Sequence, residues 1–472
     1  MKTYGACIGG EFRVLQTSLD VVSPFDGNTI GKCSLAGKPE LEEAINMAQA
    51  CEQQMATLPS YQKQEILNGI AAGLQSERTM LANLLAMEAG KPIKYALGEV
   101  DRAIQTYRIA AEECKRLPSE YIQLDWTPAG EGKEGLVKHF PVGLVAGISP
   151  FNFPLNLTSH KIAPAIAAGC PIILKPASST PLSALELARI IYKTSLPKGA
   201  LSILPMDRES GNQLVTDQRF NLLTFTGSPQ VGWRMKTLAG NKKVVLELGG
   251  NAGVIVTETA NLDRAIPKCI SGAFAYSGQV CIHTQRIYVH RNIFTQFEEG
   301  MISGTKKLVI GNPLDPATDI SSMIDSENTL RVKNWVNEAI QGGAKLLHGG
   351  RTEGNVYLPT ILTNTQPNMK VCVEEIFGPV VIMEPFDEFA EAIAVINNST
   401  FGLQAGVFTN RIDEEQQAFS QLKVGGVIVN DVPTFRVDHM PYGGIKDSGL
   451  GREGVKYAIH DMMEPRLLVR SY

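Results

Sequence analysis

The chain of 472 residues lacks the features by which several classes of protein are recognised. Its 44 lysines and arginines nearly balance 48 aspartates and glutamates, so no positive excess favours nucleic acid or an anionic membrane as a partner. Residues 1–13 contain only a brief apolar stretch before charged residues, which argues against a secretory signal. The longest uncharged run, 142–159, is interrupted by Pro150 and Pro154 and is not typical of a membrane helix. We therefore expect a cytoplasmic protein with neither nucleic acid nor a membrane as a partner.

Paired cysteines are also missing. The eight cysteines contain no Cys-x-x-Cys pair and stand at positions 7, 33, 51, 114, 170, 269, 281 and 372. This scatter argues against a zinc site and against a disulfide framework, so we expect no metal and free, reduced thiols.

The length and the hydrophobic patterning predict an α/β protein. A chain of 472 residues is too long for one core and should form two or three domains. After a short β segment at 4–16, residues 39–57 and 60–117 show helical spacing and predict a helical N-terminal layer. Apolar runs then alternate with helical patterns, in a rhythm that restarts after Gly250. Such alternation predicts parallel sheets with helices on both faces.

The expected strands fall into two series and an excursion. They are 144–148, 171–175, 201–205, 221–226 and 243–248, then 253–257, 286–290, 345–348, 380–386, 406–409 and 426–430. Residues 119–138 lose the helical pattern and predict an excursion or hairpin. The tail, 464–471, predicts a strand that pairs either with this excursion or with another subunit.

Three segments carry side chains that suit chemistry on a carbonyl group. Cys281 ends a Gly-containing loop, Glu247 ends an apolar strand before two glycines, and Asn152 lies in a Pro-bracketed turn. Taken singly, each is better explained by a plain structural role, namely as a core cysteine, a salt-bridged strand-end acid and a turn residue. Taken together, a thiolate, a desolvated carboxylate and an amide donor are the groups that thioester chemistry requires.

Seven segments resemble the aldehyde dehydrogenase superfamily and occur in the order of that family. They are Pro150-Phe-Asn-Phe-Pro154, Lys175-Pro-Ala, Phe225-Thr-Gly-Ser228, Glu247-Leu-Gly-Gly250, Gly278-Gln-Val-Cys281, Glu374-Glu-Ile-Phe-Gly-Pro379 and Pro441-Tyr-Gly-Gly-Ile-Lys446. The resemblance implies two doubly wound domains, a Rossmann-like cofactor domain and a catalytic domain, with a small β element that builds homodimers or homotetramers. The expected boundaries are 1–118 with 139–248 for the cofactor domain, 249–440 for the catalytic domain and 119–138 with 455–472 for the bridging element.

The resemblance also implies roles for the catalytic residues. Cys281 attacks the aldehyde, and the Asn152 amide and the Cys281 backbone N–H hold the oxyanion. Glu247 activates the water that hydrolyses the thioester; family members that pass the acyl group to coenzyme A commonly lack this base, so a free acid is expected. Lys161 matches a lysine near the catalytic centre, and its plain alternative is a solvated helix residue.

The cofactor site departs from ordinary dinucleotide motifs, since no G-x-G-x-x-G follows a strand. Gly227-Ser-Pro-Gln-Val-Gly232 instead follows a strand and begins a helix, where free N–H groups favour phosphate, and the family uses this turn for the pyrophosphate. By the resemblance, Lys175 and Glu375 hold the riboses and Phe377 lies beside the nicotinamide; their plain alternatives are a strand-end charge for Lys175 and a core residue for Phe377. The expected cofactor-binding residues are Lys175, Ser178, Gly227, Ser228, Gly232, Leu248, Glu375 and Phe377.

Ser178 bears on the choice of cofactor. NAD-preferring relatives often carry a glutamate at this position, where a carboxylate binds the ribose 2′-hydroxyl and repels a 2′-phosphate. With Lys175 close by, a serine removes the repulsion, so we expect NADP to be preferred and NAD also to be accepted.

The substrate is predicted to be a small aldehyde with a hydroxylated or anionic tail. Val280 stands where relatives that act on phosphorylated aldehydes often have an arginine, which disfavours glyceraldehyde 3-phosphate. Arg436 and His439 lie in a loop that the family uses to line the aldehyde tunnel, in a stretch that resembles lactaldehyde dehydrogenases and related enzymes. Arg436 could orient an anionic tail, or could form only a loop or interface salt bridge.

Three alternatives stay open at this level. The enzyme could be a semialdehyde dehydrogenase, such as one for succinic semialdehyde, or a cofactor-independent thiol esterase that uses the same cysteine. It could also be a catalytically silent relative. The intact Cys281, Glu247 and Asn152 argue against a silent protein, and Lys175, Glu375 and Phe377 would have no purpose in an esterase.

Overall fold

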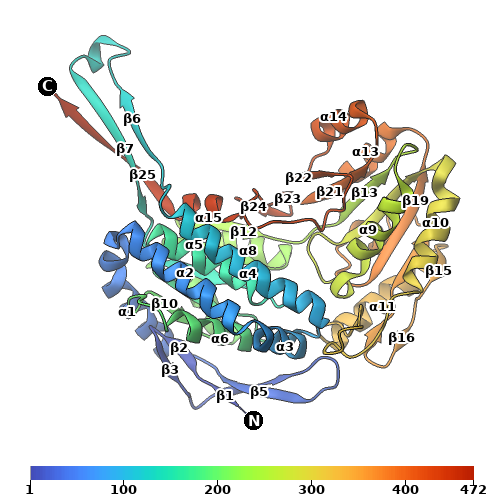
Figure 1. The fold of residues 1–472 in the computed structure, drawn as a ribbon, viewed down its shortest axis with the longest axis horizontal. Coiled ribbons are helices and arrows are strands. Elements are labelled where there is room, and N and C mark those ends of the chain that lie inside the picture. Colours follow the sequence, from blue (N-terminus) through green and yellow to red (C-terminus); the bar gives the residue numbers. More distant parts are fainter. Residues whose placement is uncertain (1) are drawn as a thin grey trace.

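The computed structural model describes residues 2–472, which form two helix-covered β sheets and a projecting three-stranded arm (Figure 1). The N-terminal helical layer is confirmed. Its helices are α1 (Lys38–Thr57), α2 (Ser60–Ser76), α3 (Arg78–Ala89) and α4 (Ile93–Glu113). The α/β fold class is likewise confirmed.

The first sheet has a parallel centre and antiparallel edges. In spatial order its strands are β24 (Gly449–Leu450), β12 (Lys243–Glu247), β11 (Leu222–Thr226), β8 (Val145–Ile148), β9 (Ile172–Lys175), β10 (Leu201–Ile203), β2 (Ala6–Ile8) and β3 (Glu11–Arg13). The five strands from β12 to β10 run parallel, whereas β2 and β24 add to the edges antiparallel. The prediction of a purely parallel sheet was therefore wrong at the edges, because these short strands enter from distant parts of the chain without a helical crossover.

Helices cover both faces of this sheet. They are α5 (Asn156–Ala168), α6 (Leu182–Ile191), α7 (Arg208–Thr216) and α8 (Pro229–Leu238), together with the N-terminal layer. Successive strand residues point to opposite faces, so Ile172 and Leu174 pack into one hydrophobic core and Ile173 into the other. Helix α7 was not predicted, although the Asp207 side chain accepts a hydrogen bond from the Ser210 N–H in its first turn. The helix start expected after Gly227-Ser is confirmed, because α8 begins at Pro229.

The strand order places a ligand site at one edge of the first sheet. Strand β8 pairs with β9 on one side and with β11 on the other, so the direction of winding reverses between β8 and β11. Ligands of open α/β sheets bind outside the carboxyl ends of the strands at such a switch point. Asn152 and Gly227 lie in the segments that follow β8 and β11, and Glu247 is the last residue of β12.

The second sheet follows directly on the first, because only residues 248–251 separate β12 from β13. Its strands, in spatial order, are β15 (Lys345–His348), β18 (Thr360–Thr363), β19 (Val380–Phe386), β14 (Thr284–His290), β13 (Ala252–Val256), β21 (Gln404–Phe408) and β22 (Gly426–Val429). All pairings are parallel except that of β15 with β18. Its helices are α9 (Leu262–Phe274), α10 (Arg291–Thr305), α11 (Ser326–Gln341), α13 (Phe389–Asn397) and α14 (Ile412–Gln421); β18 and α14 were not predicted.

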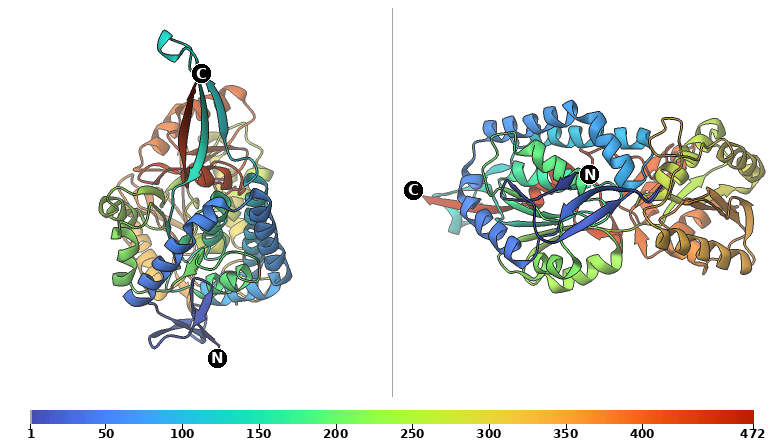
Figure 2. Two further views of the ribbon diagram at one scale, coloured as in Figure 1. Left: turned by 90° about the vertical axis from the view of Figure 1, so that its left-hand side faces the viewer. Right: turned by 90° about the horizontal axis from the view of Figure 1, so that it is seen from below.

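The arm consists of β6 (Ser119–Gln123), β7 (Lys133–Pro141) and β25 (Met463–Ser471), and it carries the C-terminus away from the body (Figures 1 and 2). The predicted hairpin at 119–138 is confirmed. The tail strand β25 pairs antiparallel with β7 along its whole length, so the expected pairing of the tail with the excursion is confirmed. Its other edge faces no strand of the described residues.

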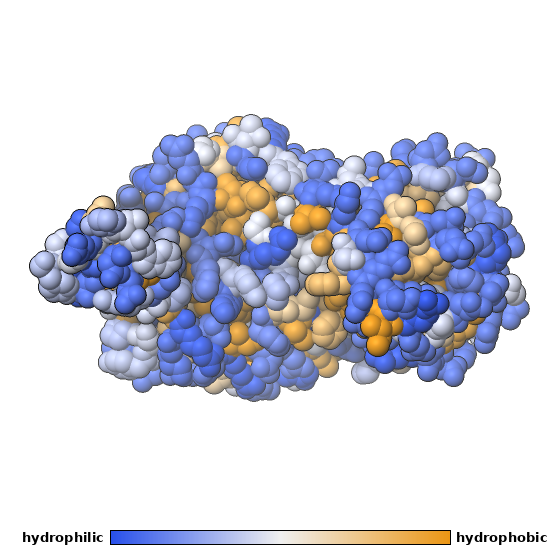
Figure 3. All heavy atoms as spheres, turned by 90° about the horizontal axis from the view of Figure 1, so that it is seen from above, coloured by the Kyte–Doolittle hydropathy of each residue, from blue (hydrophilic) through white to orange (hydrophobic). Residues whose placement is uncertain are grey.

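Small elements complete the chain. They are β1 (Thr3–Tyr4), β4 (Ser18–Val22), β5 (Thr29–Ser34), η1 (Pro128–Gly130), η2 (Ala275–Gly278), β16 (Thr352–Glu353), β17 (Val356–Tyr357), α12 (Lys370–Val373), β20 (Phe401–Gly402), β23 (Ile445–Lys446) and α15 (Val455–Asp461). The domain boundaries expected from the sequence stay a prediction. None of the helices within residues 2–472 combines the length and the apolarity that a membrane crossing requires. Seen from above, hydrophobic patches are interspersed among the polar atoms that cover most of the surface (Figure 3).

Candidate active site

A cavity of about 560 Å³ lies where the carboxyl ends of the first sheet meet the second sheet. Its wall includes Cys281, Glu247 and Asn152, which are thus brought together from three separate segments. Most of the predicted cofactor residues lie on the same wall, namely Gly227, Ser228, Leu248, Glu375 and Phe377.

Cys281 follows a turn with an unusual backbone. Tyr276 and Ser277 have φ angles of 51° and 53°, and Gly278 has a φ of 68°, so three successive residues adopt left-handed conformations. A side chain at Gly278 would collide with the carbonyl group of Gly378, so only glycine fits there. Such strain is characteristic of functional sites, and here it determines where the thiol is presented.

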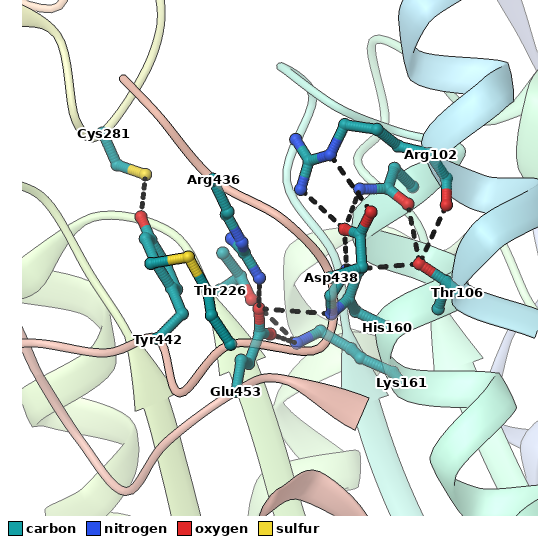
Figure 4. A network of polar contacts seen from close by, with 12 residues as sticks. Arg102, Thr106, His160, Lys161, Thr226, Cys281, Arg436, Asp438, Tyr442 and Glu453 are labelled. Carbon is teal, nitrogen blue, oxygen red and sulfur yellow. Dashed lines mark hydrogen bonds and ion pairs between the residues drawn. The ribbon is translucent and has the colours of Figure 1, made fainter. Parts of the chain in front are cut away.

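The thiol of Cys281 is half-buried, whereas the other seven cysteines are buried. Its sulfur lies 2.9 Å from the hydroxyl oxygen of Tyr442 (Figure 4). Burial raises the pKa of the thiol to about 11, and the hydrogen bond with Tyr442 acts in the opposite direction. Among the cysteines, Cys281 alone combines partial exposure with a place on the cavity wall.

Glu247 ends β12 with a buried carboxyl group that is only 3% exposed. Within residues 2–472, neither of its carboxylate oxygens has a hydrogen-bond partner. Burial, followed by the charge of Glu453, raises its pKa well above the ordinary value, although Arg436 and Lys161 oppose this shift. The interpretation as a salt-bridged strand-end acid was therefore wrong, and the oxygens are free to take a proton.

Asn152 is 4% exposed, and its Nδ2 donates a hydrogen bond of 3.0 Å to the carbonyl oxygen of Gln279. This bond ties the turn after β8 to the segment that leads to Cys281. An amide nitrogen carries two hydrogens, so one remains for another acceptor.

Lys91 holds Asn152 from the other side, and the sequence reading missed it. Its Nζ donates a hydrogen bond of 2.7 Å to the Asn152 carbonyl oxygen and pairs with the fully buried carboxylate of Glu99. The ammonium also lies 3.8 Å from the ring centroid of Phe153 and 4.3 Å from that of Tyr276. Lys91 thus joins the turn of Asn152 to the strained turn before Cys281.

Lys161 is buried within α5 and is not the solvated helix lysine of the plain alternative. Its Nζ donates hydrogen bonds to the hydroxyls of Thr226 at 2.7 Å and Thr224 at 3.1 Å. It also lies 3.6 Å from a carboxylate oxygen of Glu453. Burial lowers its pKa, while the charges of Glu453 and Glu247 act to raise it.

Arg436 forms the loop salt bridge that was one of its two interpretations. Its Nη2 donates a hydrogen bond of 2.8 Å to Glu453, and its guanidinium lies 3.6 Å from the ring centroid of Tyr442. The side chain is 6% exposed and, among the described residues, is not part of the wall of the 560 Å³ cavity. His439 from the same loop is exposed.

Arg102 and Asp438 form a further ion pair of the same network, which was not predicted from the sequence (Figure 4). Asp438 accepts a hydrogen bond of 2.7 Å from Arg102 Nη2, and its carboxylate lies 2.8 Å from His160 Nε2. Although burial acts to raise it, these partners hold the pKa of Asp438 well below its usual range. The side chain of Arg102 is 28% exposed, so it is more accessible than Arg436.

A second hollow of about 350 Å³ adjoins the cavity and shares Ile148, Phe225 and Val231 with it. The predicted Lys175 and Ser178 line this hollow. Two arginines that were not predicted, Arg208 at the start of α7 and Arg234 in α8, line it as well. With Asn212, five polar or cationic side chains therefore surround a space next to the switch point.

The turn between β11 and α8 packs tightly against the residues that follow β12. A side chain at Gly232 would run into Leu248, so glycine allows α8 to pack against the end of β12. The N–H of Gly227 donates a hydrogen bond of 3.0 Å to the Glu247 carbonyl oxygen, so the expectation of a free N–H was wrong at this residue. The N–H groups that lack intrahelical acceptors here are instead those in the first turn of α8, and such groups suit an anion.

Glu375 and Phe377 complete the wall. A carboxylate oxygen of Glu375 accepts a hydrogen bond of 2.9 Å from the Gly250 N–H, and burial raises its pKa to about 7. Phe377 has a φ of 43° and packs edge-to-face on Phe151, with 5.8 Å between ring centroids. Two adjoining hollows at a switch point, with a helix N-terminus between them, fit an extended dinucleotide.

This combination of a doubly wound sheet, a dinucleotide-sized groove and a thiol at its end defines a cofactor-dependent oxidoreductase. The family model "Aldehyde dehydrogenase family" matches residues 13–468. The chain belongs to this family and is an NAD(P)-dependent aldehyde dehydrogenase, as the seven segments indicated.

Two curated relatives match nearly the whole chain. The 3-sulfolactaldehyde dehydrogenase of Priestia megaterium is 44% identical over 470 residues, which cover 99% of this chain and 98% of the relative. The lactaldehyde dehydrogenase of Methanococcus aeolicus is 40% identical over 469 residues, with 98% and 99% coverage.

Solved structures show the same fold. Aldehyde dehydrogenase 21 from Physcomitrella patens, in complex with the reaction product succinate, superposes with a TM-score of 0.98 at 45% identity and covers 100% of this chain and 98% of its own. The glyceraldehyde-3-phosphate dehydrogenase of Methanocaldococcus jannaschii, complexed with NADP, has a TM-score of 0.92 at 38% identity, with 97% and 100% coverage.

Proposed function

We propose that this enzyme oxidises a short-chain aldehyde with an anionic or hydroxylated tail to the free carboxylic acid. The observation that carries the proposal is that Cys281, Glu247 and Asn152 share the wall of one cavity. The chemistry then proceeds in two stages, acylation of the thiol and hydrolysis of the thioester.

In the first stage, the Cys281 thiolate adds to the carbonyl carbon and forms a carbon–sulfur bond. The carbonyl oxygen becomes an oxyanion, which accepts hydrogen bonds from the free Nδ2 hydrogen of Asn152 and from the Cys281 N–H. An oxyanion donor of this kind contributes about 3 kcal/mol to the transition state. Lys91 and Gln279 hold the Asn152 side of this arrangement in place.

NAD(P), when bound, would supply the acceptor for the hydride that the thiohemiacetal carbon loses as the thioester forms. Lys175 and Glu375 would hold its riboses and the first turn of α8 its pyrophosphate.

In the second stage, Glu247 takes a proton from a water molecule, which attacks the thioester carbon. The carbon–sulfur bond breaks, the acid leaves, and the sulfur regains a proton. The buried, unpaired carboxylate suits this task because its raised pKa makes it a stronger base than an ordinary glutamate.

The charged network beside the thiol favours an anionic tail. Arg102 pairs with Asp438, whereas Arg436 and Lys161 lie against Glu453, so three cations take part in this network. Three of the four relatives point the same way, because 3-sulfolactaldehyde, glyceraldehyde 3-phosphate and succinate carry an anionic group, whereas the lactaldehyde of the fourth is neutral and hydroxylated.

A rate comparison with matched aldehydes tests the proposal. Reduction of NADP and of NAD is measured at 340 nm with succinic semialdehyde, lactaldehyde, glyceraldehyde 3-phosphate and butanal. We expect kcat/KM for succinic semialdehyde to exceed that for butanal, which lacks the carboxylate, by at least about tenfold, since one charged contact is worth 1.5 kcal/mol or more. Equal kcat/KM values for succinic semialdehyde and butanal would contradict an anionic substrate. The rate with lactaldehyde would then show whether the enzyme recognises a hydroxylated tail instead.

Arg102→Gln is expected to raise KM for succinic semialdehyde about tenfold and to leave butanal nearly unchanged. The change removes the more accessible of the two arginines, while Asp438 keeps His160 as a neighbour. Steady-state rates with both aldehydes provide the check. An equal loss for both substrates would show that Arg102 serves the fold rather than the tail.

Ser178→Glu is expected to shift the preference from NADP toward NAD. A carboxylate next to Lys175 would repel the 2′-phosphate, and like charges brought together cost several kcal/mol, so kcat/KM for NADP should fall at least tenfold. Parallel titrations with the two cofactors measure the shift, with Ser178→Ala as the uncharged control. If NADP is preferred as strongly as before, Arg208 and Arg234 rather than residue 178 decide the choice.

We also propose that the enzyme forms homodimers or homotetramers through the arm. The edge of β25 is open, and Leu467, Leu468 and Val469 are each nearly half exposed. The mass of the enzyme in solution, compared with that of a chain truncated before β25, tests this role.

A further inference from the structure

Cys281 has a hydrogen-bonding partner, Tyr442, to which the two proposed chemical stages assign no role. Tyr442 is 2% exposed, and its hydroxyl lies 2.9 Å from the sulfur of Cys281, although 161 positions separate the two residues in the chain (Figure 4).

The phenol is fixed from several directions. Its backbone N–H and carbonyl oxygen form two hydrogen bonds with Glu453, of 2.9 and 2.6 Å. The guanidinium of Arg436 lies over its ring and donates a hydrogen bond to the same glutamate. Glu453, Arg436 and Tyr442 thus form a rigid support whose last atom is the hydroxyl at the thiol.

We propose that Tyr442 is a positioning residue for the nucleophile, whose hydroxyl holds the Cys281 sulfur in place and donates a hydrogen bond to it when the thiol loses its proton. The proposal rests on the proposed function, in that Cys281 is taken as the nucleophile.

The direction of the hydrogen bond follows from the surroundings. Burial, followed by the charge of Cys281, raises the pKa of Tyr442 well above its ordinary value, so the phenol keeps its proton while the thiol titrates. A hydrogen bond to the charged form of a group favours that form, and therefore opposes the burial that raises the thiol pKa.

Other charged groups around the sulfur act as well. Arg436 favours the thiolate, whereas Glu375 and Glu247 disfavour it. The pKa of Glu375 is raised to about 7 and that of Glu247 well above its ordinary value, so both lose their protons as the pH rises. All three groups are retained when only the hydroxyl of Tyr442 is removed.

Tyr442→Phe isolates the contact, because the ring and its stacking with Arg436 remain. The test is the rate at which iodoacetamide alkylates Cys281 in the full-length, cofactor-free enzyme, followed from pH 6 to pH 11 by mass spectrometry of the Cys281 peptide. We expect the apparent pKa of the thiol to rise by about one unit in the variant, so that alkylation at pH 7.5 slows about tenfold. Tyr357→Phe, which removes another buried phenol hydroxyl, is the control and should follow the wild type.

The outcomes separate this proposal from the proposed function. If alkylation of Cys281 inactivates the wild type and the profile of Tyr442→Phe is unchanged or shifted downward, the role of Tyr442 is refuted and that of Cys281 stands. If alkylation of Cys281 leaves aldehyde oxidation intact, the proposed function itself fails. A loss of alkylation rate in Tyr357→Phe equal to that in Tyr442→Phe would assign the effect to general packing and would also refute the proposal.

Discussion

Cys281→Ala is expected to lower aldehyde oxidation at least about 10⁴-fold, because the variant has no atom that can form the thioester. Binding of NADP should be unchanged, since the predicted cofactor residues lie on other segments of the wall. The alanine leaves the strained turn at Tyr276 and Ser277 in place, so the fold should not be affected. Rates at 340 nm and cofactor titration by fluorescence measure the two effects.

The matched control is Cys51→Ala, which removes a buried thiol from α1. This variant should retain activity and lose only stability, as expected for a small cavity in a core. Retained turnover in Cys281→Ala, or an equal loss in both variants, would show that Cys281 is not the nucleophile.

Glu247→Gln is expected to separate the two chemical stages. The amide keeps the shape of the side chain but cannot take a proton from water, so hydrolysis should slow by about 10²- to 10⁴-fold. Acylation does not need this base, and stopped-flow absorbance at 340 nm should show a burst of about one reduced cofactor per active site before a slow steady state. Loss of the burst would mean that Glu247 acts in the first stage.

The pH dependence of hydrolysis should also reflect the ionisation of Glu247. Glu247 acts as a base only when deprotonated, so its activity is lost below its pKa and gained above it. Because burial raises that pKa, the rise in the hydrolytic rate should fall at higher pH than for an ordinary glutamate. The rise of the rate with pH should be missing from the steady-state profile of Glu247→Gln. If the rise persists in this variant, a group other than Glu247 causes it.

The local positions of Glu247 and Asn152 could be predicted from the sequence because they lie at the ends of regular elements. Glu247 ends a strand of apolar residues and Asn152 follows another, so the pattern placed each at a strand end, and only the folded sheet shows that the two ends lie at one edge. Cys281 was found through its motif rather than through periodicity.

The groups around them could not be found in that way. Tyr442, Arg102 and Lys91 reach the site from distant segments, and their meaning depends on contacts that only the folded chain creates. Arg436 shows the same limit, because no pattern distinguished a residue that binds a substrate tail from one that pairs with Glu453. The antiparallel edges of the first sheet escaped notice because strands of two or three residues carry no readable period.

Mass spectrometry of Glu247→Gln after a single turnover tests the central claim most directly. The variant is mixed with NADP and the best aldehyde of the panel, quenched in acid at the end of the burst and digested. The peptide that contains Cys281 should gain the mass of the acyl group less one hydrogen, and Cys281→Ala in the same background should gain nothing. A burst without any adduct, or an adduct on another residue, would contradict a thioester on Cys281 that Glu247 hydrolyses.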